Sequence, residues 1–251
     1  MGRKALMVMA AVCAVVFSVN AENVAKITTF EGNVSVLKKG AADWRDAKPG
    51  AALEVGDQVY TREESFAEIR YSIGTVLRMD EKTKVTIEES SEKTVRTTSG
   101  LGSVWVNMRK LISTGKQFEV ATPTAVAAIR GTVFDFSYTP DSATYVNVFE
   151  GKVAVGPSDS LKKQLEQEKK KEQKKETIKK EHIEVPGPEE IPGPYEVSLE
   201  QWLTIVAGQK ISVHKDGKFA KEKMDMAAME KEKFVKKNLA LDKELMKEKG
   251  K

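Results

Sequence analysis

The chain has 251 residues, of which 31% are charged and 40% hydrophobic, enough for one large domain or two small ones around a modest core. The net charge of +4 is unevenly spread: residues 1–21 carry about +2, residues 161–184 about +3 and residues 215–251 about +4, which leaves about −5 on the β-rich remainder. An acidic globular part with basic attachments excludes the charge pattern of a nucleic-acid-binding protein.

Residues 1–21 have the order of a secretory signal peptide. Arg3 and Lys4 precede an apolar stretch that ends at Phe17, and small residues lead to Ala21. We expect cleavage after Ala21, with an uncleaved anchor as the alternative, because the apolar stretch is shorter than the ~20 residues that span a bilayer. The sequence therefore predicts a periplasmic or secreted protein that is not integral to the membrane after processing.

The residues after Ala25 predict an all-β domain. Apolar residues alternate in short runs, as in Phe66–Ile73, and this period of two is that of a strand. Val34 and Val36 follow Glu31-Gly32-Asn33, which predicts a hairpin at that glycine. Short strands at spacings of ~8–12 residues predict a compact two-layer sandwich or jelly roll, or a short solenoid, and periodicity alone leaves these open.

The segment from Ala121 to Gly151 is the most informative stretch. Phe134 and Phe136 fall on one strand face, Pro140-Asp141 ends that run, and a second run ends at Glu150-Gly151. The pattern predicts a meander of antiparallel strands. It also places Asp135, which stands between two core-facing residues, on the outer face.

Motifs in this segment resemble the signature of the FecR-like domain family. Thr122–Thr132 reads TPTAVAAIRGT, and an E-G-x-V-x-V run begins at Glu150. An earlier family pattern is matched by Gly32, Trp44, Gly50, Leu53, Gly56, Asp57, Thr61, Ala67, Tyr71, Gly74 and Leu77, and Val206–Gln209 resembles the family's L-x-x-G-Q turn. The signature residues carried over are Pro123, Arg130, Gly131, Thr132, Glu150, Gly151, Gly208 and Gln209.

The resemblance implies an exported, non-catalytic binding or sensing module of the bacterial envelope that acts through a protein partner. The family's named member is an iron-citrate regulator that relays a signal from an outer-membrane transporter to a cytoplasmic sigma factor. We expect this chain to lack the cytoplasmic anti-sigma segment and any later transmembrane helix. Relay across the inner membrane and a role in iron uptake are therefore not carried over.

The signature residues have a structural interpretation of their own. Pro123 suits a strand start or an edge, and Gly131 suits a bend where a side chain would not fit. We expect Arg130 to hold the fold, with its guanidinium bonded to backbone carbonyls or to an acid on a neighbouring strand. The alternative is that Arg130 contacts a partner.

Residues 157–194 interrupt the strand pattern. Residues 161–184 are almost entirely Lys, Glu and Gln without an apolar stripe, which predicts a solvated helix or disorder. Two Pro-Gly-Pro repeats follow as a semi-rigid linker. We interpret residues 157–194 as an insertion into one β domain formed by residues 22–156 and 195–214.

Residues 215–251 form the C-terminal part. Phe219–Lys249 has a helical apolar stripe, into which Lys231, Asn238 and Asp242 intrude. We expect a charged amphipathic helix that docks on its own domain or frays in solvent. A helix that binds a partner or a membrane surface is the alternative.

Catalytic and metal-binding patterns are not found in the sequence. Cys13, the one cysteine, lies in the signal segment, so we expect no disulfide in the mature chain. His182 and His214 have no further ligands at metal spacing, and no nucleophile elbow or phosphate loop is present. We therefore expect no enzyme activity, metal, cofactor or nucleic acid.

A second hypothesis is a module that binds envelope carbohydrate or peptidoglycan. Such a module would need exposed aromatic residues on a concave face, for which Trp44, Trp105 and Trp202 are the candidates.

Overall fold

The structure, a computed structural model, describes residues 23–108, 116–179 and 202–249. Its elements are β1 (Ala25–Glu31), β2 (Val34–Leu37), β3 (Arg45–Asp46), β4 (Ala52–Leu53), β5 (Gln58–Thr61), β6 (Phe66–Tyr71), β7 (Val76–Met79), β8 (Lys84–Ser90), β9 (Thr94–Ser99), β10 (Gly102–Met108), β11 (Gln117–Ala121), β12 (Ala125–Ile129), β13 (Thr132–Tyr138), β14 (Thr144–Glu150), β15 (Lys152–Pro157), α1 (Asp159–Lys179), β16 (Leu203–Val206), β17 (Gln209–Val213), β18 (Phe219–Lys223), α2 (Met226–Met229) and α3 (Lys233–Lys249). The predicted signal peptide at residues 1–21 and the predicted linker and strand of residues 185–199 lie outside the described residues. No helix of the described ranges combines the length and the apolar character needed to cross a membrane.

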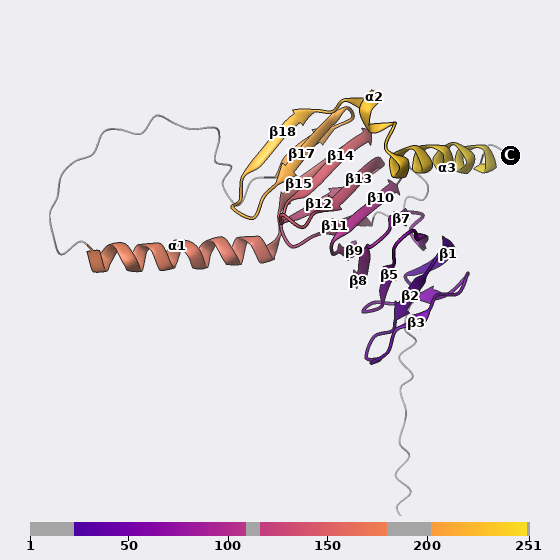
Figure 1. Ribbon diagram of the computed structural model, residues 1–251, viewed down its shortest axis with the longest axis horizontal. Helices are drawn as coiled ribbons and strands as arrows, with labels where there is room; N and C mark the ends of the chain where they lie inside the picture. Colours follow the sequence, from indigo (N-terminus) through magenta and orange to yellow (C-terminus); the bar gives the residue numbers. More distant parts are fainter. Residues whose placement is uncertain (1–22, 109–115, 180–201, 250–251) are drawn as a thin grey trace, which may run out of the picture.

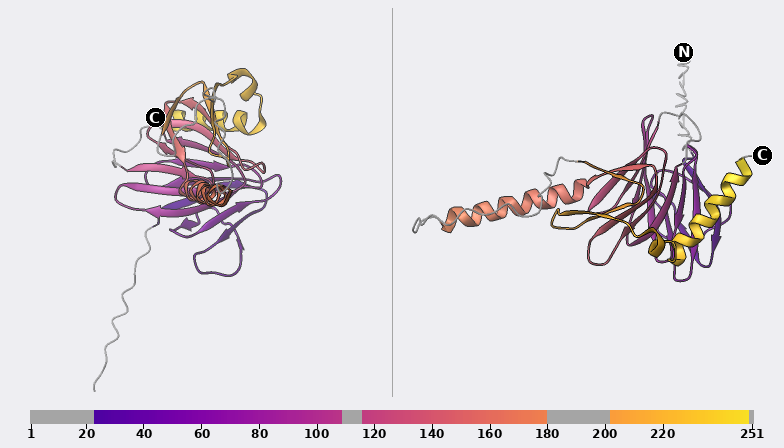
Figure 2. Two further views of the ribbon diagram at one scale, coloured as in Figure 1. Left: turned by 90° about the vertical axis from the view of Figure 1, so that its left-hand side faces the viewer. Right: turned by 90° about the horizontal axis from the view of Figure 1, so that it is seen from above.

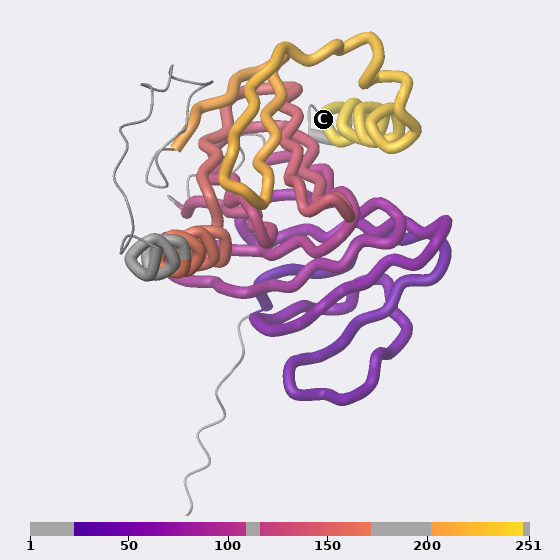
Figure 3. The backbone as a smooth tube through the Cα atoms, turned by 60° about the vertical axis from the view of Figure 1, so that its left-hand side comes forward, coloured from indigo at the N-terminus to yellow at the C-terminus, as the bar shows by residue number. Residues whose placement is uncertain are grey.

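The strands form two nine-stranded sheets, which confirms the all-β prediction. Sheet A has the order β18-β17-β14-β13-β10-β7-β6-β1-β4, and sheet B the order β16-β15-β12-β11-β9-β8-β5-β2-β3. Both orders follow the sequence almost strand by strand, so the colours in Figure 3 advance steadily along the molecule. The architecture therefore joins the two predicted alternatives: two packed layers, built by a chain that winds between them like a solenoid.

The core lies between the two sheets. It is filled by the inward residues of each strand, including Leu77, Phe134 and Phe136 from sheet A and Phe118 and Val155 from sheet B. These side chains are fully buried because alternate residues on a strand point to the same face. The alternation that predicted the strands therefore also identified the inner face of each one.

Two turns that were predicted as hairpins are corners between the sheets. Gly32 joins β1 of sheet A to β2 of sheet B, and Glu150-Gly151 joins β14 of sheet A to β15 of sheet B. The predicted meander is therefore wrong at these points: β15 pairs with β12 and β16 rather than with β14. A glycine turn between alternating runs looks alike in sequence whether the next strand pairs with the previous one or crosses to the other layer.

Helix α1 extends from one side of the sandwich (Figure 1). The Ser158 hydroxyl accepts a hydrogen bond from the Leu161 backbone N–H at 3.0 Å and so caps its start. Leu161 is buried in the core and Leu165 packs against it, so the first turns are anchored. At 1.5 Å per residue the helix is about 30 Å long. The sequence predicted either a solvated helix or disorder for this charged segment. Its described part is a helix.

The C-terminal part begins with a strand and not with the predicted helix. β18 pairs antiparallel with β17 across a turn at Asp216-Gly217, an Asp-Gly hairpin signal that the helical stripe obscured. The chain then makes the short α2, whose cap is the carboxylate of Asp225, and continues into α3. Helix α3 lies against the outer face of sheet A (Figure 2).

Candidate functional site

The three signature glycines occupy corners where the chain passes between the sheets. Gly131 joins β12 to β13, Gly151 joins β14 to β15, and Gly208 joins β16 to β17. Their φ angles are +70°, +77° and +79°, a left-handed conformation in which any other residue is strained. The signature therefore marks successive corners of the winding.

The first two corners pack against each other. A Cβ on Gly151 would lie 2.5 Å from the Gly131 carbonyl oxygen, so no side chain fits there. At Gly131 and Gly208 a Cβ would meet no atom within 4 Å. The expectation that Gly131 lacks room for a side chain is therefore wrong, because only its positive φ requires glycine.

The other signature residues lie around these corners. The buried Thr132 hydroxyl donates to the Lys152 carbonyl at 2.7 Å. Gln209 Oε1 accepts from the Val206 backbone N–H at 3.2 Å and so closes the turn after edge strand β16. Pro123 is exposed, and its carbonyl accepts from the Ser158 hydroxyl. Glu150 is exposed at its corner.

Arg130 does not have the predicted environment. Its side chain is exposed, and no ion pair or hydrogen bond of its guanidinium occurs among the described residues. Ile129 faces the core, so the next residue along the chain faces outward. The expectation that Arg130 is a partly buried tie within the fold is therefore wrong.

Arg130 instead lies at the rim of a hollow of about 360 Å³ on the outer face of sheet B. Lys116 and Lys152 line the same hollow, and Ala128 and Ala154, which are paired in register, contribute to it. The small alanine side chains leave this face of β12 and β15 recessed between the long side chains of the three cations. We call this feature the basic hollow.

One acid near the basic hollow is already paired with another cation. Glu119 is paired in register with Ala128, but its carboxylate already binds Arg96, whose nitrogens lie 2.7 and 2.8 Å away. Lys221 adds a fourth cation beside it, since its Nζ donates to the carbonyl of the lining residue Thr204 at 3.1 Å. Three lining cations around an apolar floor can bind carboxylates through charge and, at Arg130, through forked hydrogen bonds.

Sequence reasoning identified only one of the three cations. Lys116 lies before β11 and Lys152 lies after Gly151. Both are therefore more than ten residues from Arg130 in sequence. Their common outward positions on β12, β15 and the start of β11 could have been read from the alternation. Their grouping depends on the pairing of β12 with both β11 and β15.

The three tryptophans do not form one surface. Trp105 is fully buried, which removes it as a ligand contact. Trp44 (39% exposed) precedes β3 and Trp202 (46% exposed) precedes β16, and these strands are the opposite edges of sheet B. Trp202 covers Gly156, where a Cβ would lie 2.9 Å from its ring. The predicted aromatic platform is therefore wrong as a set of three.

A larger hollow of about 730 Å³ lies where several strand-connecting turns meet at one end of the sandwich. Its lining includes Tyr60, Arg62, Lys82 and Tyr138. Trp44 stands beside it, since its ring meets Tyr60 edge-on at 6.1 Å. This end hollow is therefore a concavity that a candidate tryptophan adjoins through a ring contact.

The described residues offer no group of three or more His, Cys, Asp or Glu side chains that could hold a metal ion. The two hollows combine cations, hydroxyls and apolar surface. The fold defines the protein as a β-sandwich of two nine-stranded sheets.

The comparisons with known proteins agree with the family that the motifs suggested. Residues 57–154 match the profile of the family described as FecR protein, so the chain carries a FecR-like domain. Two crystal structures of a candidate anti-sigma factor from Parabacteroides distasonis ATCC 8503, at 2.50 and 1.65 Å resolution, are similar at 18% identity and a TM-score of 0.45. The match covers 67% of this chain and 60% of theirs. A search of curated proteins found no match.

Proposed function

We propose that this protein is an exported, non-catalytic FecR-like module of the bacterial envelope that binds a protein partner through the basic hollow. The observation that carries the proposal is the position of Arg130, the signature arginine, on the rim of that hollow and not within the core. An exposed arginine without an intramolecular partner in the described residues contributes little to folding. A binding role gives this side chain a function that the fold does not require.

The partner that fits is an acidic protein surface. Arg130, Lys116 and Lys152 supply positive charge around a floor of alanine methyl groups. A segment with carboxylates flanking a small apolar side chain would match both features, because charged groups add specificity and apolar contact adds affinity. Such binding weakens with added salt.

The test is a cross-linking capture from envelope extract with the chain that begins at Glu22. We compare the parent with Arg130→Ala and Lys152→Ala, and with Lys84→Ala as the control. Lys84 is an exposed cation on another part of sheet B. We expect one or more acidic proteins to be captured by the parent and by Lys84→Ala but lost with the two hollow variants. Equal capture by all four proteins would refute the assignment of the hollow.

A glycan site at the end hollow is the second candidate, favoured by Tyr60 and Tyr138 in its lining and by Trp44 beside it. Aromatic rings stack on sugar faces, and Arg62 would suit an acidic sugar, whereas Lys82 is already paired with Glu63 at 2.8 Å. Co-sedimentation with purified peptidoglycan that is lost in Tyr138→Ala, and kept in Arg130→Ala, would favour this function over the first.

A further inference from the structure

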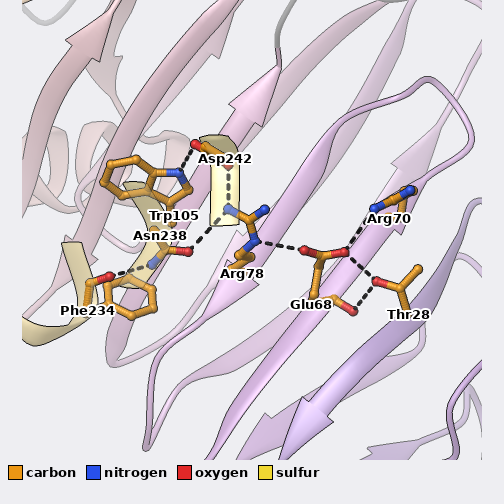
Figure 4. A network of polar contacts seen from close by, with 8 residues as sticks. All are labelled: Thr28, Glu68, Arg70, Arg78, Trp105, Phe234, Asn238 and Asp242. Carbon is orange, nitrogen blue, oxygen red and sulfur yellow. Dashed lines mark hydrogen bonds and ion pairs between the residues drawn. The ribbon is translucent and has the colours of Figure 1, made fainter. Parts of the chain in front are cut away.

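The outer face of sheet A carries a row of polar residues at its centre. Glu68, Arg78 and Trp105 are consecutive register partners on β6, β7 and β10. Arg78 and Trp105 are 0% exposed, although they point away from the core between the sheets. Helix α3 covers them (Figure 4).

Arg78 and Trp105 together bind one carboxylate. Arg78 Nη1 donates to Asp242 Oδ1 at 2.6 Å, and the indole Nε1 of Trp105 donates to Asp242 Oδ2 at 2.9 Å. Arg78 Nη2 is buried and has no partner in the described part of the chain. The sheet thus presents two donors to a single carboxylate and keeps a third nitrogen beside it, and we call this arrangement the carboxylate clamp.

The sheet side of the clamp is prepared independently of the helix. Arg78 Nε donates to Glu68 Oε2 at 2.8 Å, and Glu68 Oε1 accepts from the Thr28 hydroxyl at 2.7 Å and from Arg70 at 3.2 Å. Burial would raise the pKa of Glu68, but the hydrogen bonds from Thr28 and Arg78 outweigh it and lower the pKa. Glu68 therefore stays ionised and orients Arg78 toward the helix.

The helix binds with the residues that interrupt its apolar stripe. Asn238 and Asp242, four residues apart and so on one helix face, are almost fully buried, whereas Met246 is 51% exposed. The Asn238 amide donates to the Phe234 carbonyl at 2.9 Å, and its Oδ1 lies 3.5 Å from Arg78 Nη1. The contact face of α3 is therefore specified by polar chemistry.

Apolar contacts flank the clamp on one side. Val235 of α3 packs with Trp105, Val133, Phe149 and Met224 in a small cluster outside the main core. At the other side Lys237 binds Glu31 at 2.8 Å and lies 3.7 Å above the Phe66 ring. Buried tryptophan and arginine within an apolar surround is the composition of a protein-binding hot spot.

We propose that this face of sheet A is a helix-binding site built around the carboxylate clamp, and that it accepts α3 from a second copy of the chain in place of its own. Without Asp242, Arg78 Nη1 and the Trp105 indole N–H would lose their carboxylate acceptor at a buried site, which is strongly disfavoured. In the purified protein only another α3 offers Asn238 and Asp242 at the right spacing. Helix α3 is attached through the short segment of Asp225–Glu232, so its exchange leaves both sheets intact.

The site is separate from the basic hollow, which lies on sheet B, so this inference does not depend on the proposed function. Helix exchange would create a dimer in which each copy supplies Asp242 to its partner's clamp. Exchange of identical elements is a common route to symmetric dimers.

Complementation between two full-length variants tests the proposal. Asp242→Asn keeps a clamp but has a defective helix, and Arg78→Ala keeps a helix but has no clamp. We expect each variant alone to be monomeric and a mixture to form a 1:1 dimer by sedimentation velocity, with at least ten-fold more dimer than either alone. Asp242→Asn mixed with the double variant Arg78→Ala/Asp242→Asn is the control, and it should stay monomeric.

Trp105 emission reports the state of the clamp, measured with Trp44→Phe and Trp202→Phe in all chains. We expect Asp242→Asn to shift this emission to the red and the mixture to reverse the shift. If Arg78→Ala does not fold, Arg78→Met/Glu68→Gln replaces it, because this pair removes both buried charges. A mixture of folded variants that stays monomeric, or an unshifted emission in Asp242→Asn, would overturn the proposal.

Discussion

A buried carboxyl group on sheet A should make the stability of this protein depend on pH. Asp135 is on the outer face, as its sequence position predicted, but is only 7% exposed. Its Oδ2 accepts from the Asn147 amide at 3.0 Å, and its Oδ1 has no partner among the described residues. Burial raises the pKa of Asp135 to about 7 against the opposing Asn147 hydrogen bond, with a further contribution from the charge of Asp80.

The sign of the effect follows from proton binding. The folded-state pKa lies above the ordinary value of 3.8, so between about pH 4 and pH 7 the folded protein holds more protons than the unfolded chain. The free energy of unfolding therefore falls as the pH rises through this window and then levels off. At ~1.36 kcal/mol for each pKa unit, the loss is about 4 kcal/mol.

Asp135→Asn should remove most of this dependence, because an amide resembles the protonated carboxyl and can still accept from Asn147. We expect the variant to be about 2–4 kcal/mol more stable than the parent at pH 8 and nearly unchanged at pH 4. Urea unfolding at several pH values measures this difference. Asp46→Asn, at an exposed site, controls for the loss of one negative charge.

Parallel pH curves for the parent and Asp135→Asn would refute the reasoning.

Three further predictions follow from the corners and the chain start. Arg130→Ala should change the free energy of unfolding by less than about 0.5 kcal/mol, so a thermal melt well below the parent would return Arg130 to a structural role. Gly151→Ala should cost more than Gly208→Ala, because both add strain of about 1–2 kcal/mol at positive φ but only the former brings a Cβ within 2.5 Å of the Gly131 carbonyl oxygen; equal melting temperatures would contradict this. Intact mass of the exported protein should correspond to cleavage after Ala21, and a mass that retains residues 1–21 would contradict the signal-peptide prediction.

Much of the fold could be predicted because strand formation is largely local. Alternation at Phe134 and Phe136 identified both a strand and its inner face, and the glycines at positions 131, 151 and 208 identified places where the chain turns. The motif between Thr122 and Gly151 also indicated the family, which the profile match confirmed. Each of these signals lies within a few residues of sequence.

The candidate sites were only partly predictable, because they join residues that are distant in the chain. Arg130 was identified, but its exposure depends on the direction in which β12 faces within sheet B. Asp242 looked like an interruption of an apolar stripe, since nothing near it in sequence shows that Arg78, 164 residues away, needs a carboxylate.

The sequence by itself determined most of the strands, their inner faces and the glycine turns between them, because these follow from side-chain period and backbone conformation. Only the tertiary structure decided which glycine turns cross between the sheets and which cations meet in the basic hollow. It also decided that Asn238 and Asp242, which interrupt the apolar stripe of α3, are buried beside Val235 against sheet A. Those outcomes depend on which strands pair and on how buried charges find partners, and these are free energies of contacts between segments that no local pattern encodes.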